Sequence, residues 1–134
     1  MRRLIVVLVL AVFLAACGDS PGEQQHNDVI TDAMSSALTA RDDVVDAEIV
    51  YQNNLDASAS AAVKVTVAEG ADPRPVADEV VRLLWTSTLT PLNGVSVSVW
   101  DVTDNKRSDV RIMSFKDAAT RSDLEAELGP RPVT

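Results

Sequence analysis

The sequence has few of the side chains that most often carry enzyme chemistry. Its 134 residues include one cysteine, Cys17, and one histidine, His26. A single cysteine excludes an intrachain disulfide and a zinc site built from several thiolates. A Ser-His-Asp triad would depend on His26, and the five glycines form no phosphate-binding loop. We therefore expect a protein without catalytic residues and without a cofactor.

The one long apolar run lies near the start of the chain. Leu4–Phe13 spans about ten apolar residues, whereas a membrane-spanning helix needs about twenty. Arginines precede this run at positions 2 and 3, and small residues follow it at positions 15 and 16. Positive, apolar and small residues in that order are typical of a secretory signal peptide. We expect residues 1–16 to be cleaved from a secreted protein.

The tetrad Leu14-Ala15-Ala16-Cys17 resembles the lipobox of bacterial lipoproteins. This resemblance covers residues 1–20 and implies that diacylglycerol, with fatty acyl chains such as palmitate, is attached to the sulfur of Cys17. It also implies cleavage between Ala16 and Cys17, which leaves Cys17 at the N-terminus. Two acyl chains suffice for a membrane anchor, since each buried methylene contributes about 0.8 kcal/mol. The alternative is an ordinary signal peptide followed by an unmodified cysteine.

The lipoprotein resemblance implies a location on the extracytoplasmic side of the cell membrane. Charge limits which partners the protein can have there. The sequence contains 12 Lys and Arg against 20 Asp and Glu, which gives a net charge of −8. Loss of Arg2 and Arg3 would leave ten basic residues and a net charge of −10. Such a surface repels nucleic acid and anionic lipid headgroups, so we expect no nucleic-acid partner and membrane contact through the lipid. We interpret the excess of acidic residues as a means of keeping the domain soluble, and it would also favour cationic partners.

Both ends of the mature chain lack apolar periodicity. Residues 17–27 read as a lipidated, flexible tether, polar in composition and containing Gly, Pro and Gln. His26 lies in this stretch, so we interpret it as a solvated side chain rather than a metal ligand. Residues 130–134 are predicted to be a loose tail. A single domain over residues 28–129 remains between them.

Helical and strand periodicities alternate along this domain. Apolar residues recur at helical spacing after a cap at Asn27 or Asp28, and a second helix is expected after an N-cap at Asp72. Ser122 and Glu125 form a capping box for a short third helix, which Gly129 ends. Strands are predicted over residues 45–51, 61–67, 95–102 and 110–115.

The order helix, strand, strand, helix, strand, strand, helix predicts an α+β fold. We expect a two-layer sandwich with the helices on one face of a sheet of roughly four strands. The first two strands should pair with each other, and so should the last two. This order is similar to that of small αββ modules of bacterial envelope proteins. The resemblance rests on element order and assigns no functional residue.

Two groups of acidic residues raise chemical hypotheses: the first could supply the paired carboxylates of a glycosidase, and the second could bind calcium. Asp46 and Glu48, members of the first group, fall on the polar face of a predicted strand and read as solvated. The second group offers oxygen ligands at loop spacing but lacks the glycine and final glutamate of an EF-hand loop. We expect neither a catalytic pair nor a metal site. The glycosidase-like group is Asp42, Asp43, Asp46 and Glu48, and the calcium-like group is Asp101, Asp104, Asn105 and Asp109.

The two tryptophans are the remaining candidates for recognition, because tryptophan is enriched at binding hot spots. Trp85 adjoins the apolar stripe of the second helix, and Trp100 lies on the polar face of its strand. We expect both to pack at the edges of a small core, with Trp100 the candidate interaction residue. Two hypotheses follow: a non-catalytic module that binds an envelope protein through a sheet face or edge, and a lipoprotein that binds a small ligand or ion. An exposed apolar patch favours the first, and a concave pocket with converging polar groups favours the second.

Overall fold

The computed structural model describes residues 21–54 and 57–132, and its elements follow the predicted order of an α+β fold. The predicted signal peptide, the predicted cleavage site and Cys17 lie outside the described residues. Within the described part of the chain, no helix combines the length and hydropathy of a membrane span. The elements are α1 (Pro21–Thr39), β1 (Val44–Asn54), β2 (Ala57–Val67), α2 (Pro73–Thr86), β3 (Gly94–Asp101), β4 (Ser108–Ser114) and α3 (Ala118–Leu128).

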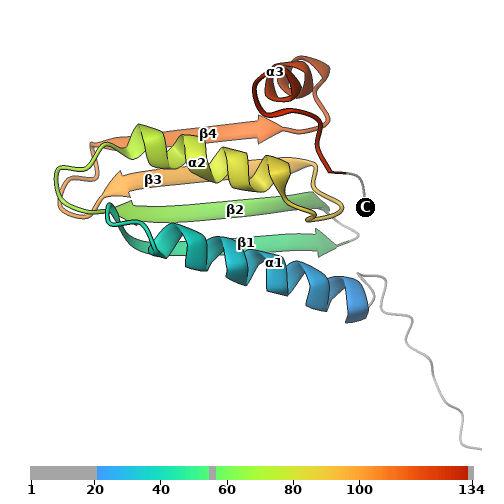
Figure 1. Cartoon of the computed structure of the whole chain (residues 1–134), viewed down its shortest axis with the longest axis horizontal. Coiled ribbons are helices and arrows are strands. Elements are labelled where there is room, and N and C mark those ends of the chain that lie inside the picture. Colours follow the sequence, from blue (N-terminus) through green and yellow to red (C-terminus); the bar gives the residue numbers. More distant parts are fainter. Residues whose placement is uncertain (1–20, 55–56, 133–134) are drawn as a thin grey trace, which may run out of the picture.

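The strands form one sheet in the order β1-β2-β3-β4 (Figure 1). β1 pairs antiparallel with β2, and β3 pairs antiparallel with β4, so both predicted pairings are confirmed. β2 and β3 pair in parallel, with Val63 opposite Val97. Parallel neighbours need a crossover connection, and α2 supplies it. The two antiparallel pairs therefore meet at the centre of the sheet.

α1 and α2 lie on the same side of the sheet, α1 against β1 and α2 against β3 and β4 (Figure 1). Alternate residues of the central strands point towards these helices, because side chains in a strand alternate between its two faces. Full burial of each valine side chain contributes about 1.5–3 kcal/mol. The central valines of this core, each at most 1% exposed, are Val63, Val65, Val67, Val97 and Val99.

The first helix starts earlier than predicted. α1 begins at Pro21, so residues 21–27 are helical, and the prediction of a flexible tether through Asn27 was wrong for them. Asn27 is buried, and its side-chain nitrogen donates to the carbonyl of Thr90 at 3.4 Å. His26 lies 3.4 Å from the hydroxyl of Thr88 through its Nε2 atom. These polar residues lack apolar periodicity because they pack against a loop rather than against the sheet.

The third helix also begins before its predicted capping box. Asp117 is the N-cap, since its carboxylate accepts hydrogen bonds from the backbone N–H (2.9 Å) and hydroxyl (3.0 Å) of Thr120. These bonds lower the pKa of Asp117. The capping box at Ser122 was therefore wrong, although Gly129 ends the helix as predicted, with φ of 82°. The predicted N-cap of α2 is confirmed, because the Asp72 carboxylate accepts from the N–H of Arg74 at 3.0 Å.

The segment after α3 packs against the domain. The indole nitrogen of Trp85 donates to the carbonyl of Gly129 at 2.8 Å, and its ring meets Phe115 edge-to-face at 5.1 Å. The guanidinium of Arg131 lies 5.6 Å from the centre of the Phe115 ring and donates to the carbonyls of Leu89 and Leu92. The prediction of a loose tail was therefore wrong for Arg131. Residues 133 and 134 lie outside the described residues.

Replacing Trp85 with alanine should lower the free energy of unfolding by about 3–5 kcal/mol, because it leaves a cavity in the core and removes the donor to the partly buried carbonyl of Gly129. Urea unfolding followed by circular dichroism measures this loss. Trp100→Ala is the matched control, since Trp100 is partly exposed while Trp85 is 1% exposed. Equal losses for the two variants would contradict the placement of Trp85 in the core.

Candidate functional site

The helices leave one face of the sheet uncovered, and we call it the open face (Figure 1). It carries the residues that alternate with the core valines. One row across the four strands joins Val50, Ala62, Ser96 and Ile112 as successive partners. The neighbouring row runs through Glu48, Lys64, Ser98 and Val110.

Apolar side chains are concentrated on the β4 side of the open face. Ile112 is 83% exposed and Val110 is 60% exposed. Trp100 is half-buried and pairs with Ser108, two residues from Val110, so its indole is a diagonal neighbour of Val110. We call Trp100, Val110 and Ile112 the open-face patch. Contiguous exposed apolar side chains of this kind mark interaction sites in soluble domains.

Sequence reasoning singled out Trp100 but missed its two neighbours. The segment from Val110 to Phe115 has apolar side chains at both odd and even positions, so its alternation does not reveal which face is buried. The decisive residue is Arg111, whose guanidinium turns towards α2 and forms an ion pair with Asp78 at 2.7 Å. Because Arg111 faces the helices, Val110 and Ile112 must face the other way.

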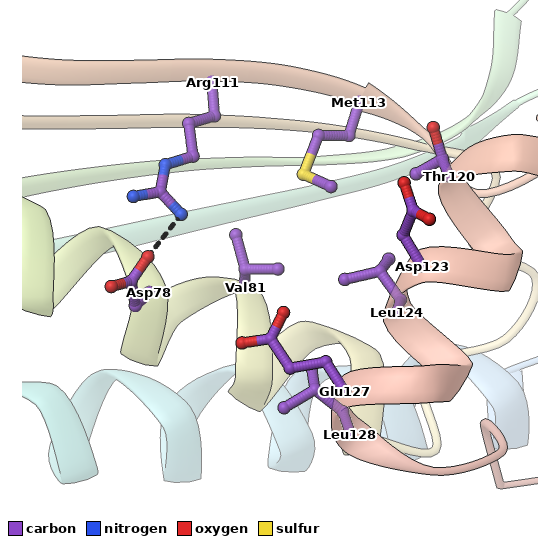
Figure 2. A pocket seen from close by; sticks show the side chains of 9 residues that line it. All are labelled: Asp78, Val81, Arg111, Met113, Thr120, Asp123, Leu124, Glu127 and Leu128. Atoms are coloured by element: carbon purple, nitrogen blue, oxygen red, sulfur yellow. Dashed lines mark ion pairs between the residues drawn. The ribbon is translucent and has the colours of Figure 1, made fainter.

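A pocket of about 260 Å³ lies between α2, β4 and α3 (Figure 2). Its apolar wall comes from all three elements, through Val81, Met113, Leu124 and Leu128. Carboxylates surround this wall, with Asp78 near Arg111 and with Asp123 and Glu127 on α3 (Figure 2).

The charge of this pocket is negative because its one cation is already neutralised. Arg111 donates to both oxygens of Asp109, at 3.0 and 2.9 Å, in addition to its ion pair with Asp78. The hydrogen bonds between Arg111 and Asp109 raise the pKa of the guanidinium and lower the pKa of the carboxyl. Asp123 and Glu127 form no ion pair with any residue in the described part of the chain. The pocket is therefore suited to an apolar group that carries a positive charge.

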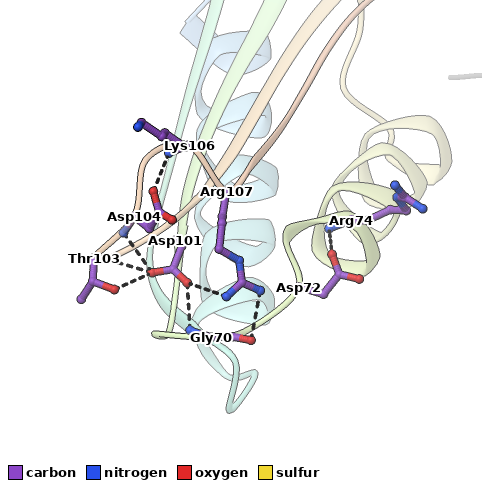
Figure 3. A network of polar contacts seen from close by, with 8 residues as sticks. All are labelled: Gly70, Asp72, Arg74, Asp101, Thr103, Asp104, Lys106 and Arg107. Carbon is purple, nitrogen blue, oxygen red and sulfur yellow. Dashed lines mark hydrogen bonds and ion pairs between the residues drawn. The ribbon is translucent and has the colours of Figure 1, made fainter.

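The loop after β3 is occupied by its own hydrogen bonds (Figure 3). The Asp101 carboxylate accepts from the N–H groups of Gly70 (2.8 Å), Thr103 (2.8 Å) and Asp104 (3.3 Å), and from the Thr103 hydroxyl (3.0 Å). The guanidinium of Arg107 lies 3.8 Å away. Backbone donors, that of Thr103 first, lower the pKa of the buried Asp101 to about 2. This carboxylate ties the loop to the turn before α2.

The calcium-like group is not assembled into a cation site. Asp104 accepts from the N–H of Lys106 at 3.0 Å, and Asp109 is paired with Arg111. Among the residues that the structure describes, no three His, Cys, Asp or Glu side chains are grouped as metal ligands.

The glycosidase-like carboxylates have separate environments. Asp43 is held by two hydrogen bonds of 2.8 Å from Arg41, in the turn between α1 and β1, and Asp42 is exposed. Asp46 and Glu48 lie exposed on the open face, as the strand periodicity predicted. Glu48 stands opposite Lys64. Neither acidic group therefore forms the site that its residue types suggested.

Comparisons with models of protein families, with curated proteins and with solved structures found no match. The open-face patch and the pocket between α2, β4 and α3 are two surface features of the described residues that could bind a partner or ligand.

Replacing Asp101 with asparagine should lower the melting temperature at pH 7, because an amide oxygen accepts from backbone donors less strongly than a carboxylate. The folded pKa of about 2 lies below the unfolded value of about 3.9. A depressed folded pKa adds stability above the unfolded pKa, and this stability is lost as the pH falls through the folded pKa. The difference between native protein and variant should therefore shrink between pH 4 and pH 2.

Thermal unfolding at a series of pH values measures this dependence. Asp123→Asn is the control, since it removes an exposed carboxylate of α3 that has no such donors. A difference for Asp101→Asn that stays constant down to pH 2 would contradict the assigned role of its carboxylate.

Proposed function

We propose that this protein is a non-catalytic lipoprotein of the bacterial cell envelope that presents its αβ domain for binding to another protein. In this proposal diacylglycerol on Cys17 holds the domain on the extracytoplasmic side of the cell membrane. The lipobox resemblance supports the anchor, and the open-face patch supports protein binding. The patch is the observation on which the binding proposal depends.

The patch supports binding because of where its apolar side chains are placed. Ile112 and Val110 are adjacent on one face of an edge strand, where polar side chains are expected when a sheet face meets water. The half-buried indole of Trp100 extends the patch towards the sheet centre. An aromatic anchor beside aliphatic side chains is typical of the centre of a protein interface.

Charge indicates what kind of surface the partner offers. The open face carries Asp46 and Glu48 on the strand farthest from the patch, and both are exposed. The mature chain would have a net charge of −10. A partner with an apolar centre and basic residues along one margin would complement both features.

The early start of α1 bears on how the anchor would hold the domain. Residues 18–20 alone separate Cys17 from the first residue of α1. Since an extended chain spans at most about 3.6 Å per residue, the start of α1 would lie within about 15 Å of the Cα atom of Cys17. The domain would therefore be held close to the membrane rather than on a long tether.

Binding of a small ligand is a second candidate function, favoured by the pocket between α2, β4 and α3. Its apolar wall and its unpaired carboxylates, Asp123 and Glu127, would suit an organic cation such as an alkylamine. The pocket lies on the helical side of the sheet, so this function would not involve the open-face patch (Figure 2).

Metabolic labelling with palmitate tests the anchor. The native protein should incorporate the label and sediment with membranes, because acylation of Cys17 provides two or more buried chains. Cys17→Ala should incorporate no label and should leave the membrane fraction. Equal labelling of the two proteins would contradict lipidation at Cys17.

Site-specific photocrosslinking in living cells tests the binding surface. A photoreactive amino acid at position 112 should capture one protein reproducibly, and Val110→Asp in the same chain should reduce the yield at least tenfold because it places a charge in the interface. The probe at position 29 is the matched control, since Val29 on α1 is 63% exposed while Ile112 is 83% exposed. Capture that is equal from both positions would argue against the open face.

A further inference from the structure

The basic residues of this acidic protein are unevenly distributed. Ten lysines and arginines follow the predicted signal peptide, and Arg41, Arg82, Arg107 and Arg111 each pair with a carboxylate. Three others line one pocket of about 190 Å³ at the end of the sheet where β4 leads into α3. We call it the basic pocket; its lining residues are Lys116, Arg121, Arg131, Asn93, Leu92, Phe115 and Trp85.

The walls of the basic pocket are held in place by core contacts. Trp85 and Phe115 form the edge-to-face pair of the core. The backbone of Asn93 is fixed on both sides, because its N–H donates to Ala59 at 2.9 Å and its carbonyl accepts from Phe115 at 2.7 Å. The basic pocket is therefore already formed in the folded protein.

Carboxylates compensate the three cations only in part. Arg131 donates to the carbonyls of Leu89 and Leu92, and neither it nor Lys116 forms an ion pair with a described residue. Arg121 has one ion pair, with Glu125 at 3.8 Å, and its side chain stays 55% exposed. Asp117, next to Lys116 in the chain, directs its carboxylate to Thr120 at the start of α3.

The cations also disfavour one another. Burial lowers the pKa of Arg131, the phenol of Tyr51 acts in the opposite direction, and the positive charge of Arg121 lowers it. An anion in the pocket would relieve this repulsion. It would also replace water around the half-buried guanidinium of Arg131 and accept charge-assisted hydrogen bonds from it.

We propose that the basic pocket binds a phosphoryl group, supplied either by inorganic phosphate or by the headgroup of a phospholipid. Two guanidinium groups and one ammonium group match a tetrahedral anion with several oxygens, since arginine binds such oxygens in pairs and lysine binds as a point charge. Binding of a phosphoryl group in this pocket depends on neither lipidation of Cys17 nor binding at the open face, whereas a headgroup as its source rests on the proposed anchor.

The location of the pocket makes a headgroup one of the two sources. The start of α1 bonds to the loop after α2 through His26 and Asn27, and the same loop supplies Leu92 and Asn93 to the pocket. The start of α1, the loop after α2 and the end of β4 lie at the same end of the domain (Figure 1), and the residues that line the basic pocket belong to this end. The net charge, −8 for the full sequence and −10 after loss of Arg2 and Arg3, repels anions at long range. Contacts within a few ångströms are governed by the local cations, since the Debye length is about 10 Å at 0.1 M salt.

Isothermal titration of the full-length protein, kept in a nonionic detergent at fixed ionic strength, tests this proposal. One arm uses inorganic phosphate, and the other uses glycerophosphoglycerol, the water-soluble headgroup of phosphatidylglycerol. We expect saturable binding of at least one of them. Tighter binding of phosphate would assign the pocket to the free anion, and tighter binding of the diester would assign it to a headgroup.

A pair of charge-matched variants makes the test specific. Lys116→Gln with Arg121→Gln should weaken binding at least tenfold, and both side chains are exposed, so the fold should be kept. Arg74→Gln with Lys106→Gln removes the same charge from exposed residues elsewhere and should leave the affinity unchanged. Absence of saturable binding in both arms, or equal weakening by the two double variants, would overturn the proposal.

Discussion

The parallel pairing of β2 and β3 is the constraint on which the rest of this structure depends. It places two antiparallel pairs of strands side by side, and it requires α2 to cross from the end of one strand to the start of the next. The valines of both strands then face one side, where their burial is completed by α1 and α2. With both long helices on that side, the opposite face is left to water. The open-face patch is thus a consequence of how the core is covered.

A second organising feature is the loop between α2 and β3, which is held by its carbonyl groups. Asn27 of α1 donates to Thr90, the hydroxyl of Tyr51 donates to Pro91 at 2.6 Å, and Arg131 donates to Leu89 and Leu92. Leu89 and Leu92 are buried while Thr90 and Pro91 are exposed, and the donors to all four carbonyls come from α1, from β1 and from the segment after α3. The start of α1 and the segment after α3 are therefore ordered by the same loop.

Charge acts on two scales in this protein. The overall excess of acidic residues favours solubility and disfavours long-range approach of anions. On the scale of single pockets the pattern differs, because the ion pairs of Arg111 leave one pocket with unpaired carboxylates, while the basic pocket collects cations with few counter-charges. The net charge of the sequence predicts how the whole surface behaves. It does not predict the charge of a single pocket, because residues distant in sequence become neighbours only on folding.

The sequence by itself determined the features that local physics governs. Alternation at Val95, Val97 and Val99 specified a strand with one buried face, and Asp72 before two prolines specified the start of α2. Tertiary structure decided the strand order, the start of α1 and the outward face of β4, whereas α3 starts at a local N-cap, Asp117, that the sequence analysis passed over. The reason is that each of the placements decided by tertiary structure depends on a residue distant in sequence. Asn27 and Arg131 donate to carbonyls of the loop after α2, and Ile112 faces outward because its neighbour Arg111 pairs with Asp78 on α2. Periodicity describes the face of an isolated element, and only packing decides what that face meets.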